Sequence, residues 1–225
     1  MPKGPFGVIT IPRDNAPFPC YTIVMFIVAG LGNPGVAYEK SRHNAGYMAL
    51  DRVAEKLSIR VTKRGFSGVY GEGVRNGERI LLIKPTTYMN LSGDCLQSVS
   101  HFYKVPSERV LVLFDDIELP VGTLRIRDHG SAGTHNGMRS VVACLGSENI
   151  PRIRIGVSDE RKGDLKDYVL GKPGQEELSK LNDVYNDAAD AVAMILDGRM
   201  GDAQTKYNKR HIGGGPKPDG KAGEA

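Results

Sequence analysis

Apolar and polar residues alternate along this chain in segments that predict strands and helices in turn. Short strand-like runs lie at residues 22–29, 67–74, 79–84, 109–114, 123–128 and 152–157. Apolar residues spaced three or four apart, the helical pattern, recur at 44–57, after Ser92, and from about Gln175 to Leu196. Because strands and helices alternate, the sequence predicts an α/β domain with a single twisted, mixed β-sheet flanked by helices.

The predicted helices each have one apolar side. The side chains expected to face the core are Met48, Val53 and Leu57 in the first helix, Leu96, Val99, Phe102 and Tyr103 in the second, and Leu178, Leu181, Tyr185, Ala188, Val192 and Ile195 in the third. The glycine-rich stretch from Gly65 to Gly77 is typical of a hairpin, which is why we expect a mixed sheet rather than a wholly parallel one.

The apolar run 110–114 stops at Asp115 and Asp116. It predicts a buried central strand, and the carboxyl end of such a strand is where open α/β sheets bind ligands. A turn and an arginine-bearing strand follow. A glycine- and serine-rich loop then leads to His135 and Asn136 at the start of another helix. Acid, base and amide groups gathered so closely in sequence predict a functional site.

Length and composition predict one domain with unstructured ends. A chain of 225 residues is long enough for a substantial core. Residues 1–22 are rich in proline without periodicity, so we expect a disordered or appended segment, or a start codon placed too early. The folded domain is expected at 23–210, and the glycine-rich residues 211–225 should form a disordered tail.

Charge, cysteine content and hydropathy indicate which partners and which compartment the protein could have. A net charge of +4 and a pI near 8.9 permit a polyanionic partner. Cys20, Cys95 and Cys144 are far apart, which fits a reducing compartment and no metal-binding spacing. No apolar run reaches about 18 residues, so we expect no membrane span.

The segment 30–35, GLGNPG, matches the G-x-G-x-x-G pattern of dinucleotide-binding sites. That pattern requires a helix to begin among the glycines and an acidic residue to end the next strand. Here the proline-glycine pair is typical of a turn, and Asp51 and Glu55 fall inside the following helix. A tight turn is favoured over a cofactor site, and it leaves Asn33 near the carboxyl end of the first strand.

His43 lies in a polar loop just before a helix. It is either a solvated loop residue or a general base, since a helix N-terminus disfavours the imidazolium and keeps the ring neutral. Asp115 would fix the tautomer of His43 if it reached the other ring nitrogen. Because no G-x-S-x-G elbow is present, the simplest nucleophile is water.

Asn33, Asn90 and Asn136 follow three different predicted strands. Each is a common turn residue, and that is the alternative interpretation. Amides that both donate and accept hydrogen bonds suit a peptide backbone or a developing oxyanion.

Arginines recur on two predicted strands. Alternation puts Arg125 with Arg127, and Arg152 with Arg154, on common faces, and Arg139 follows in the next helix. These faces either meet solvent or bind phosphates. With few aromatic residues nearby, phosphate contact is favoured over base stacking.

Six ordered motifs, GLGNPG, SRHNAG, KPTTYMNLSG, LFDDIELPVG, THNG and PRIRIGV, resemble the bacterial-type peptidyl-tRNA hydrolases between about Phe26 and Tyr207. The resemblance implies hydrolysis of the ester between a peptide and the 3′ end of tRNA, by a usually monomeric enzyme without metal or cofactor. It implies that His43 activates water and Asp115 orients His43. It assigns substrate contacts to Asn33, Tyr38, Met89, Asn90, His135 and Asn136, and we expect Arg125, Arg127 and Arg154 to contact tRNA phosphates.

One motif departs from the bacterial pattern. Bacterial members usually have glycine before the His-Asn pair, whereas Thr134 stands here, and threonine adopts positive φ less readily. We therefore expect an altered loop path that affects the position of His135. The variant resembles eukaryotic or organellar relatives, so a mitochondrial location is the alternative to the expected cytoplasmic one.

Two rival functions follow from other interpretations of the same residues. The first is a non-catalytic RNA-binding relative, and the second is a dinucleotide-dependent oxidoreductase. Retention of His43, Asp115 and all three asparagines favours the enzyme, because a protein that only binds RNA has no need for a base and its orienting carboxylate.

Overall fold

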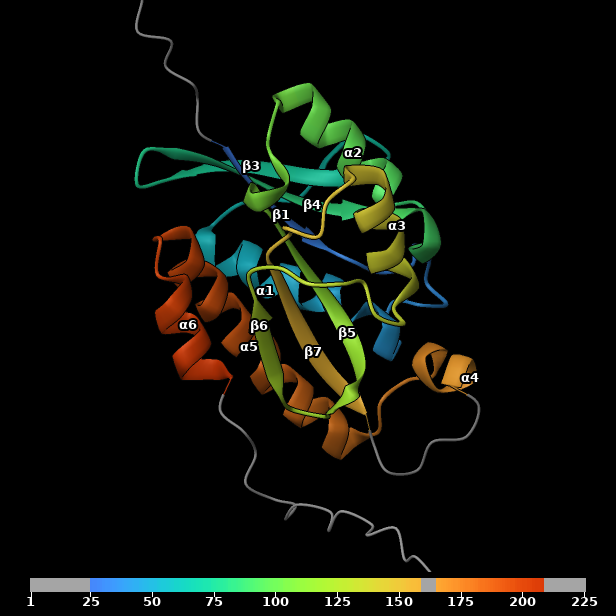
Figure 1. The fold of residues 1–225 in the computed structure, drawn as a ribbon. Helices are drawn as coiled ribbons and strands as arrows, with labels where there is room; N and C mark the ends of the chain where they lie inside the picture. The colour runs from blue at the N-terminus through green and yellow to red at the C-terminus, as the bar shows by residue number, and fades with distance from the viewer. Residues whose placement is uncertain (1–24, 159–164, 209–225) are drawn as a thin grey trace, which may run out of the picture.

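A seven-stranded mixed sheet forms the centre of the molecule, with strand order β2-β3-β4-β1-β5-β7-β6 (Figure 1). The computed structural model describes residues 25–158 and 165–208, so the terminal segments expected at 1–22 and 211–225 lie outside the described residues. The strands are β1 Met25–Gly30, β2 Lys63–Gly65, β3 Gly68–Arg75, β4 Glu78–Pro85, β5 Val110–Pro120, β6 Leu124–Arg127 and β7 Arg152–Ser158. β4, β1, β5 and β7 run parallel, and β2, β3 and β6 are antiparallel to their neighbours. The predicted fold class is confirmed.

Helices cover both faces of the sheet. They are the 3-10 turns η1 Arg42–Asn44, η2 Met89–Leu91 and η3 Ser107–Arg109, and the helices α1 Ala45–Leu57, α2 Ser92–Tyr103, α3 Asn136–Leu145, α4 Leu165–Leu170, α5 Gln175–Leu196 and α6 Met200–Tyr207. α1, α5 and α6 pack on one face, and α2 and α3 pack on the other (Figure 1). Because the central strands are buried on both faces, they contain near-continuous apolar runs.

Most predicted elements match their observed bounds to within a few residues, and β5 is the main exception. The sequence predicted that this strand ends at Phe114, but it continues to Pro120. It pairs with β7 through Asp116 and again at Pro120. The strand continues because the charge of Asp116 is neutralised by an ion pair with Arg154, so this carboxylate does not end β5.

The Gly65–Gly77 stretch contains two hairpin turns. Phe66 and Ser67, both with φ of 54°, join β2 to β3, and Asn76 and Gly77, with φ of 52° and 79°, join β3 to β4. Two consecutive positive φ angles match the twist of antiparallel strands. β2, α4 and α6 were not predicted, because each is too short to show a clear apolar period.

Two side chains expected in the core, Phe102 and Leu178, lie on the surface. Phe102 is 66% exposed, so its predicted inward position is wrong. It follows the buried Val99 at the end of α2, where its ring instead packs 5.3 Å from Phe66 and 4.8 Å from Tyr103. Leu178, at the start of α5, is also at the surface.

Close packing of α1 on the sheet brings the first loop to the carboxyl ends of the strands. A Cβ at Gly46 would lie 2.3 Å from the carbonyl oxygen of Leu113 and 2.5 Å from that of Leu31, so only glycine allows this approach. β1, β4 and β5 are parallel, so the loops that follow them meet at one edge of the sheet. The site is built there.

Candidate active site

His43 and Asp115 form a hydrogen-bonded pair at the carboxyl edge of the sheet. His43 lies in η1, and Asp115 lies in β5. His43 Nδ1 is 2.9 Å from both Oδ1 and Oδ2 of Asp115. A carboxylate only accepts hydrogen bonds, so Nδ1 carries the proton of the neutral ring and Nε2 keeps its lone pair. His43 lines the main cleft, where that nitrogen can act as a base.

Asp115 also holds a second histidine. His135 Nε2 lies 3.0 Å from Asp115 Oδ1, and the backbone N–H of Met138 donates to His135 Nδ1 over 3.1 Å. Because Nδ1 accepts, Nε2 must carry the ring proton and donate it to Asp115. Both ring nitrogens of His135 are therefore in use within the protein.

Burial and hydrogen bonding act in opposite directions on the pKa values of this group. Burial alone would raise the pKa of Asp115, but the charges and hydrogen bonds of His135 and His43 outweigh it and hold this pKa well below its usual range. Burial alone would lower the pKa of His43, but its hydrogen bond to Asp115 and the charge of that carboxylate leave the pKa raised above 6.5. The geometry thus gives an ionised carboxylate beside a basic imidazole.

Asn33 is buried and held on three sides. Its backbone N–H donates to Asn44 Oδ1 over 2.8 Å, and Asn44 Nδ2 donates to the carbonyl of Asn33 over 3.0 Å. The side-chain Oδ1 of Asn33 accepts from the N–H of Met89 over 2.8 Å. The acceptor side of the amide is thereby occupied, and the Nδ2 donor is the group left to serve the cleft. Asn44 was not predicted as a site residue, although it directly follows His43.

A cleft of about 1040 Å³ joins these groups to the other predicted contacts. It is lined by the predicted substrate residues Asn33, Tyr38, Met89, Asn90, His135 and Asn136, and by Arg127 and Arg154. Asn90 lies in η2, and the exposed Asn136 is the first residue of α3. The positive end of the α3 dipole therefore faces the cleft. Arg125 is not among the lining residues.

Arg152 links the loop before α3 to the segment that precedes β7. This side chain is 2% exposed, and it donates to the carbonyls of Ile150 at 3.0 Å, Ser131 at 2.7 Å and Glu148 at 3.2 Å. The sequence left two roles open for Arg152, contact with solvent or with phosphate. The side chain borders the cleft, but it is buried and its donors bind backbone carbonyls.

The same loop turns at its glycines. Gly130 and Gly133 have φ of 144° and 60°, whereas Thr134 is not among the residues with positive φ. Arg139 Nε donates to the carbonyl of Gly133 over 3.0 Å. The threonine is accommodated without backbone strain, and His135 still reaches Asp115.

The arginines of β6 and β7 lie across from one another. Arg125 pairs in register with Arg154. Leu124 and Ile126 are buried, whereas Arg125 is half-buried and Arg127 is exposed, so the predicted alternation is confirmed. Arg154 is bound by two carboxylates, Asp116 through Nε and Glu118 through Nη2 at 3.0 Å. A phosphate that approached Arg154 would compete with Glu118, which is largely exposed.

His43, Asp115 and His135 are also the one group among the described residues whose ligand atoms are close enough to hold a metal ion. The hydrogen bonds oppose that role, since the ring nitrogens facing Asp115 both carry protons that a metal would have to displace. Within residues 25–158 and 165–208, every helix is too short or too polar to span a lipid bilayer.

Comparison with known proteins identifies consistent relatives. Residues 27–214 match the family model described as peptidyl-tRNA hydrolase. The chain is 48% identical over 185 residues to the peptidyl-tRNA hydrolase of Carboxydothermus hydrogenoformans, covering 82% of this chain and 99% of that protein. It is 45% identical over 184 residues to that of Clostridium novyi, covering 82% and 98%. The crystal structure of peptidyl-tRNA hydrolase from Acinetobacter baumannii superposes with a TM-score of 0.77 at 32% identity, covering 82% of this chain and 94% of that one. These relatives are bacterial and give no support to a mitochondrial location.

Proposed function

The chain belongs to the peptidyl-tRNA hydrolase family, and from that premise we propose that it hydrolyses the ester bond of peptidyl-tRNA by means of a water molecule activated by His43. The observation that carries the mechanism is the bond of His43 Nδ1 to the ionised Asp115, which leaves Nε2 basic at the cleft. The products are a peptide with a free carboxylate and a tRNA with a free 3′ hydroxyl.

In the proposed reaction, His43 Nε2 takes a proton from water as the water oxygen bonds to the ester carbonyl carbon. The carbonyl oxygen becomes an oxyanion. The tetrahedral intermediate then breaks its bond to the ribose oxygen, which takes the proton from His43. His43 returns to its neutral form, so no further reactant is needed. Asp115 stays ionised throughout and stabilises the transient imidazolium.

Asn33 is our candidate for the oxyanion donor. Its position is fixed by Asn44 and Met89, so its Nδ2 would be oriented before the substrate arrives. The amino end of α3, with Asn136, adds positive potential at the same edge of the sheet. Asn90, Tyr38 and the buried Met89 would contact the peptide.

His135 is better explained as a positioning residue than as a direct substrate ligand. Its two ring nitrogens are engaged by Asp115 and Met138, so it would hold the carboxylate and offer the substrate only its ring surface. Its ring lies 5.2 Å from that of His43 and 4.8 Å from that of Phe114, between centroids.

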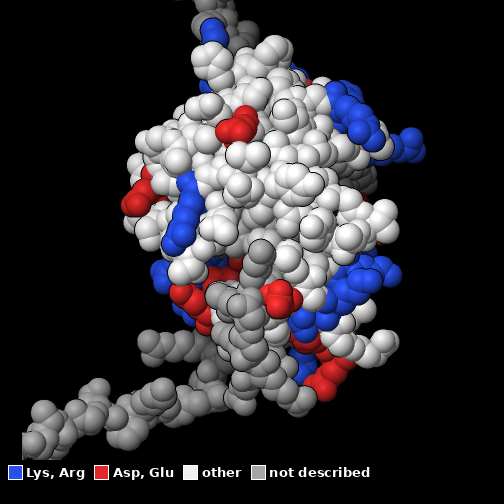
Figure 2. Space-filling view, turned by 90° about the vertical axis from the view of Figure 1, so that its right-hand side faces the viewer, with Lys and Arg blue, Asp and Glu red and all other residues white. Residues whose placement is uncertain are grey.

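The tRNA phosphates are proposed to bind at the end of the cleft lined by Arg127 and Arg154. The opposite flank, formed by α2 and α3, fits this role poorly, because Asp94 and Arg139 are the only Asp, Glu, Lys or Arg residues in these two helices. Figure 2 shows few charged side chains over the middle of that face. The substrate would then lie with its phosphates on β6 and β7 and its peptide towards η2.

The proposal is tested by release of labelled peptide from peptidyl-tRNA. His43→Ala should lower kcat by about 10²–10⁴-fold, the usual contribution of a general base, while affinity for free tRNA stays nearly unchanged. His101→Ala, at the exposed end of α2, is the matched control and should release peptide at the wild-type rate. Near-normal turnover by the His43 variant would refute the mechanism.

A further inference from the structure

We infer that three residues outside the reacting group, Arg42, Tyr168 and Glu177, form a clasp that positions His43 by fixing its turn to α4 and α5. The inference rests on the proposed role of His43 as the base. The clasp joins η1 to two neighbouring elements that lie more than 100 residues later in the chain, α4 and the first turn of α5.

The centre of the clasp is a two-point ion pair. Arg42 Nε donates to Glu177 Oε1 over 2.8 Å, and Arg42 Nη2 donates to Glu177 Oε2 over 2.6 Å. Their side chains are only 11% and 14% exposed. The hydrogen bond between them raises the pKa of Arg42 despite its partial burial. A paired, shielded fork of this kind has a defined geometry, unlike a solvated surface pair.

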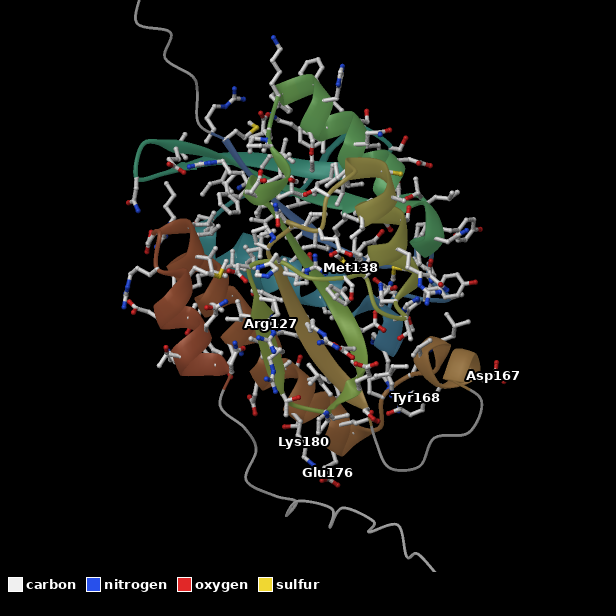
Figure 3. All side chains as sticks on the ribbon, in the orientation of Figure 1. Arg127, Met138, Asp167, Tyr168, Glu176 and Lys180 are labelled. Atoms are coloured by element: carbon white, nitrogen blue, oxygen red, sulfur yellow. The ribbon has the colours of Figure 1, made fainter. Side chains whose placement is uncertain are left out.

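Tyr168 ties α4 to the same ion pair. The guanidinium of Arg42 lies 4.3 Å from the centroid of the Tyr168 ring, and Arg42 Nη1 donates to the Tyr168 carbonyl over 3.2 Å. The Tyr168 hydroxyl donates to the carbonyl of Val157 in β7 over 2.7 Å. Tyr168 lies between α4 and the carboxyl ends of β5 and β7 (Figure 3). The next two residues of α4, Val169 and Leu170, line the cleft.

The clasp acts on His43 through the backbone. Arg42 precedes His43 in η1, a turn of three residues, and its own N–H donates to the carbonyl of Gly171 over 3.1 Å. A turn so short has few hydrogen bonds of its own, so its orientation depends on such outside contacts. Asp115 fixes one end of the imidazole, and the clasp fixes the backbone from which the ring extends. Misplacing a reacting group by about 1 Å can cost about 10²-fold in rate.

The chain contains a matched control for this arrangement. Arg75 forms the same two-point pair with Asp197, at 2.7 and 2.8 Å, and joins β3 to the end of α5. Neither residue lines the cleft. Arg75→Lys therefore removes a bidentate pair of similar geometry without affecting the turn that carries His43.

The test compares Arg42→Lys, Glu177→Gln and Arg75→Lys in the full chain. Lysine keeps the charge but cannot form the fork, and glutamine keeps the size of Glu177 and can still accept from the N–H of Gly174, which lies 3.1 Å from Oε2. We expect kcat for peptidyl-tRNA to fall about 10–100-fold in both clasp variants and to stay within about 2-fold of wild type in Arg75→Lys. Affinity for free tRNA should stay within about 2-fold of wild type in all three.

Two further measurements separate positioning from a general loss of structure. The double variant Arg42→Lys, Glu177→Gln should lose no more kcat than Arg42→Lys alone, because the fork that Glu177→Gln weakens is already lost in Arg42→Lys. Titration of the His43 ring by NMR should move to lower pH in the clasp variants, since a loosened contact with Asp115 weakens the cause of its raised pKa.

Unchanged kcat in Glu177→Gln, or an equal loss in Arg75→Lys, would overturn the inference. If Arg42→Lys does not fold, Glu177→Gln decides the matter alone. The same assays run on His43→Ala keep the two proposals apart. If His43→Ala loses most of its kcat and the clasp variants keep theirs, the clasp inference is refuted. If His43→Ala stays active, the role of His43 as the base is refuted.

Discussion

At the residue scale, the unusual feature is one buried carboxylate that serves two histidines. Asp115 accepts from His43 Nδ1 and from His135 Nε2, and it is 2% exposed. An unpaired carboxylate buried to this degree would be neutral or strongly destabilising. The two donors keep it ionised, and the ionised form is what makes His43 basic. The base is therefore set by three residues from three different elements.

This arrangement predicts the pH dependence of turnover. The neutral form of His43 is the active one, and its pKa lies above 6.5 because Asp115 favours the imidazolium. We expect kcat/KM to rise with pH along a limb centred above pH 6.5. Asp115→Asn removes the charge that raises this pKa and leaves the burial that lowers it, so the limb should move to lower pH. Turnover should also fall, by less than in His43→Ala.

The measurement is kcat/KM from pH 5 to 9 for both proteins, at constant ionic strength. The matched control is Asp128→Asn, because Asp128 also pairs with a histidine, His129, over 2.9 Å, but both are exposed at the rim of the cleft. The control limb should stay where it is in the wild type. A limb that moves to higher pH in Asp115→Asn would contradict the assignment of His43 as the base.

Among the helices and strands, those with a regular apolar spacing were predicted from the sequence. Features that depend on contacts with residues distant in sequence were missed. The long apolar strands and α1, α2 and α5 follow directly from repeated spacing. The extension of β5 beyond Phe114 depends on Arg154, which is distant in sequence and neutralises Asp116. Phe102 continues the helical pattern, yet its side chain is 66% exposed at the end of α2. No local pattern contains that information.

The residues of the candidate site likewise fall into those that the sequence predicted and those that it missed. All the predicted site residues except Arg125 line the cleft, because most of the motifs that contain them fall at the carboxyl ends of the strands. The residues that hold them were missed, since Asn44, Arg42 and Glu177 act through contacts that span long stretches of chain. The role of Arg152 stayed open, because alternation on a strand cannot distinguish an arginine facing solvent from one covered by a loop.

Arg152 leads to a prediction about the loop. Arg152→Ala should lower the free energy of unfolding by about 2–3 kcal/mol, because it removes hydrogen bonds from a charged, buried donor to three carbonyls. Turnover should also fall, since the loop that leads to His135 loses its anchor. The dependence of KM on salt should not change. Urea unfolding and KM against salt test this, and a shallower salt dependence would restore Arg152 as a phosphate contact.

At the scale of the whole molecule, charge is distributed unevenly about the cleft. The chain carries a net charge of +4, yet the face over α2 and α3 is poor in charge (Figure 2). Arg125, Arg127 and Arg154 lie on β6 and β7, at the other flank. Carboxylates already bind Arg154, so we expect Arg127, which is exposed and lines the cleft, to contribute more to phosphate binding.

The last prediction separates the binding of tRNA from ester chemistry. Arg127→Ala removes about one phosphate contact, so the slope of log KM against log salt should become shallower by about one unit, and by up to about two units when Arg125 is replaced as well. KM should rise at physiological salt while kcat at saturation stays near wild type, as for the loss of uniform binding. A peptide esterified to a lone adenosine lacks the distant phosphates and should be cleaved equally by all these proteins. If the slope for intact peptidyl-tRNA is unchanged, these arginines meet only solvent, and the tRNA is bound by another surface.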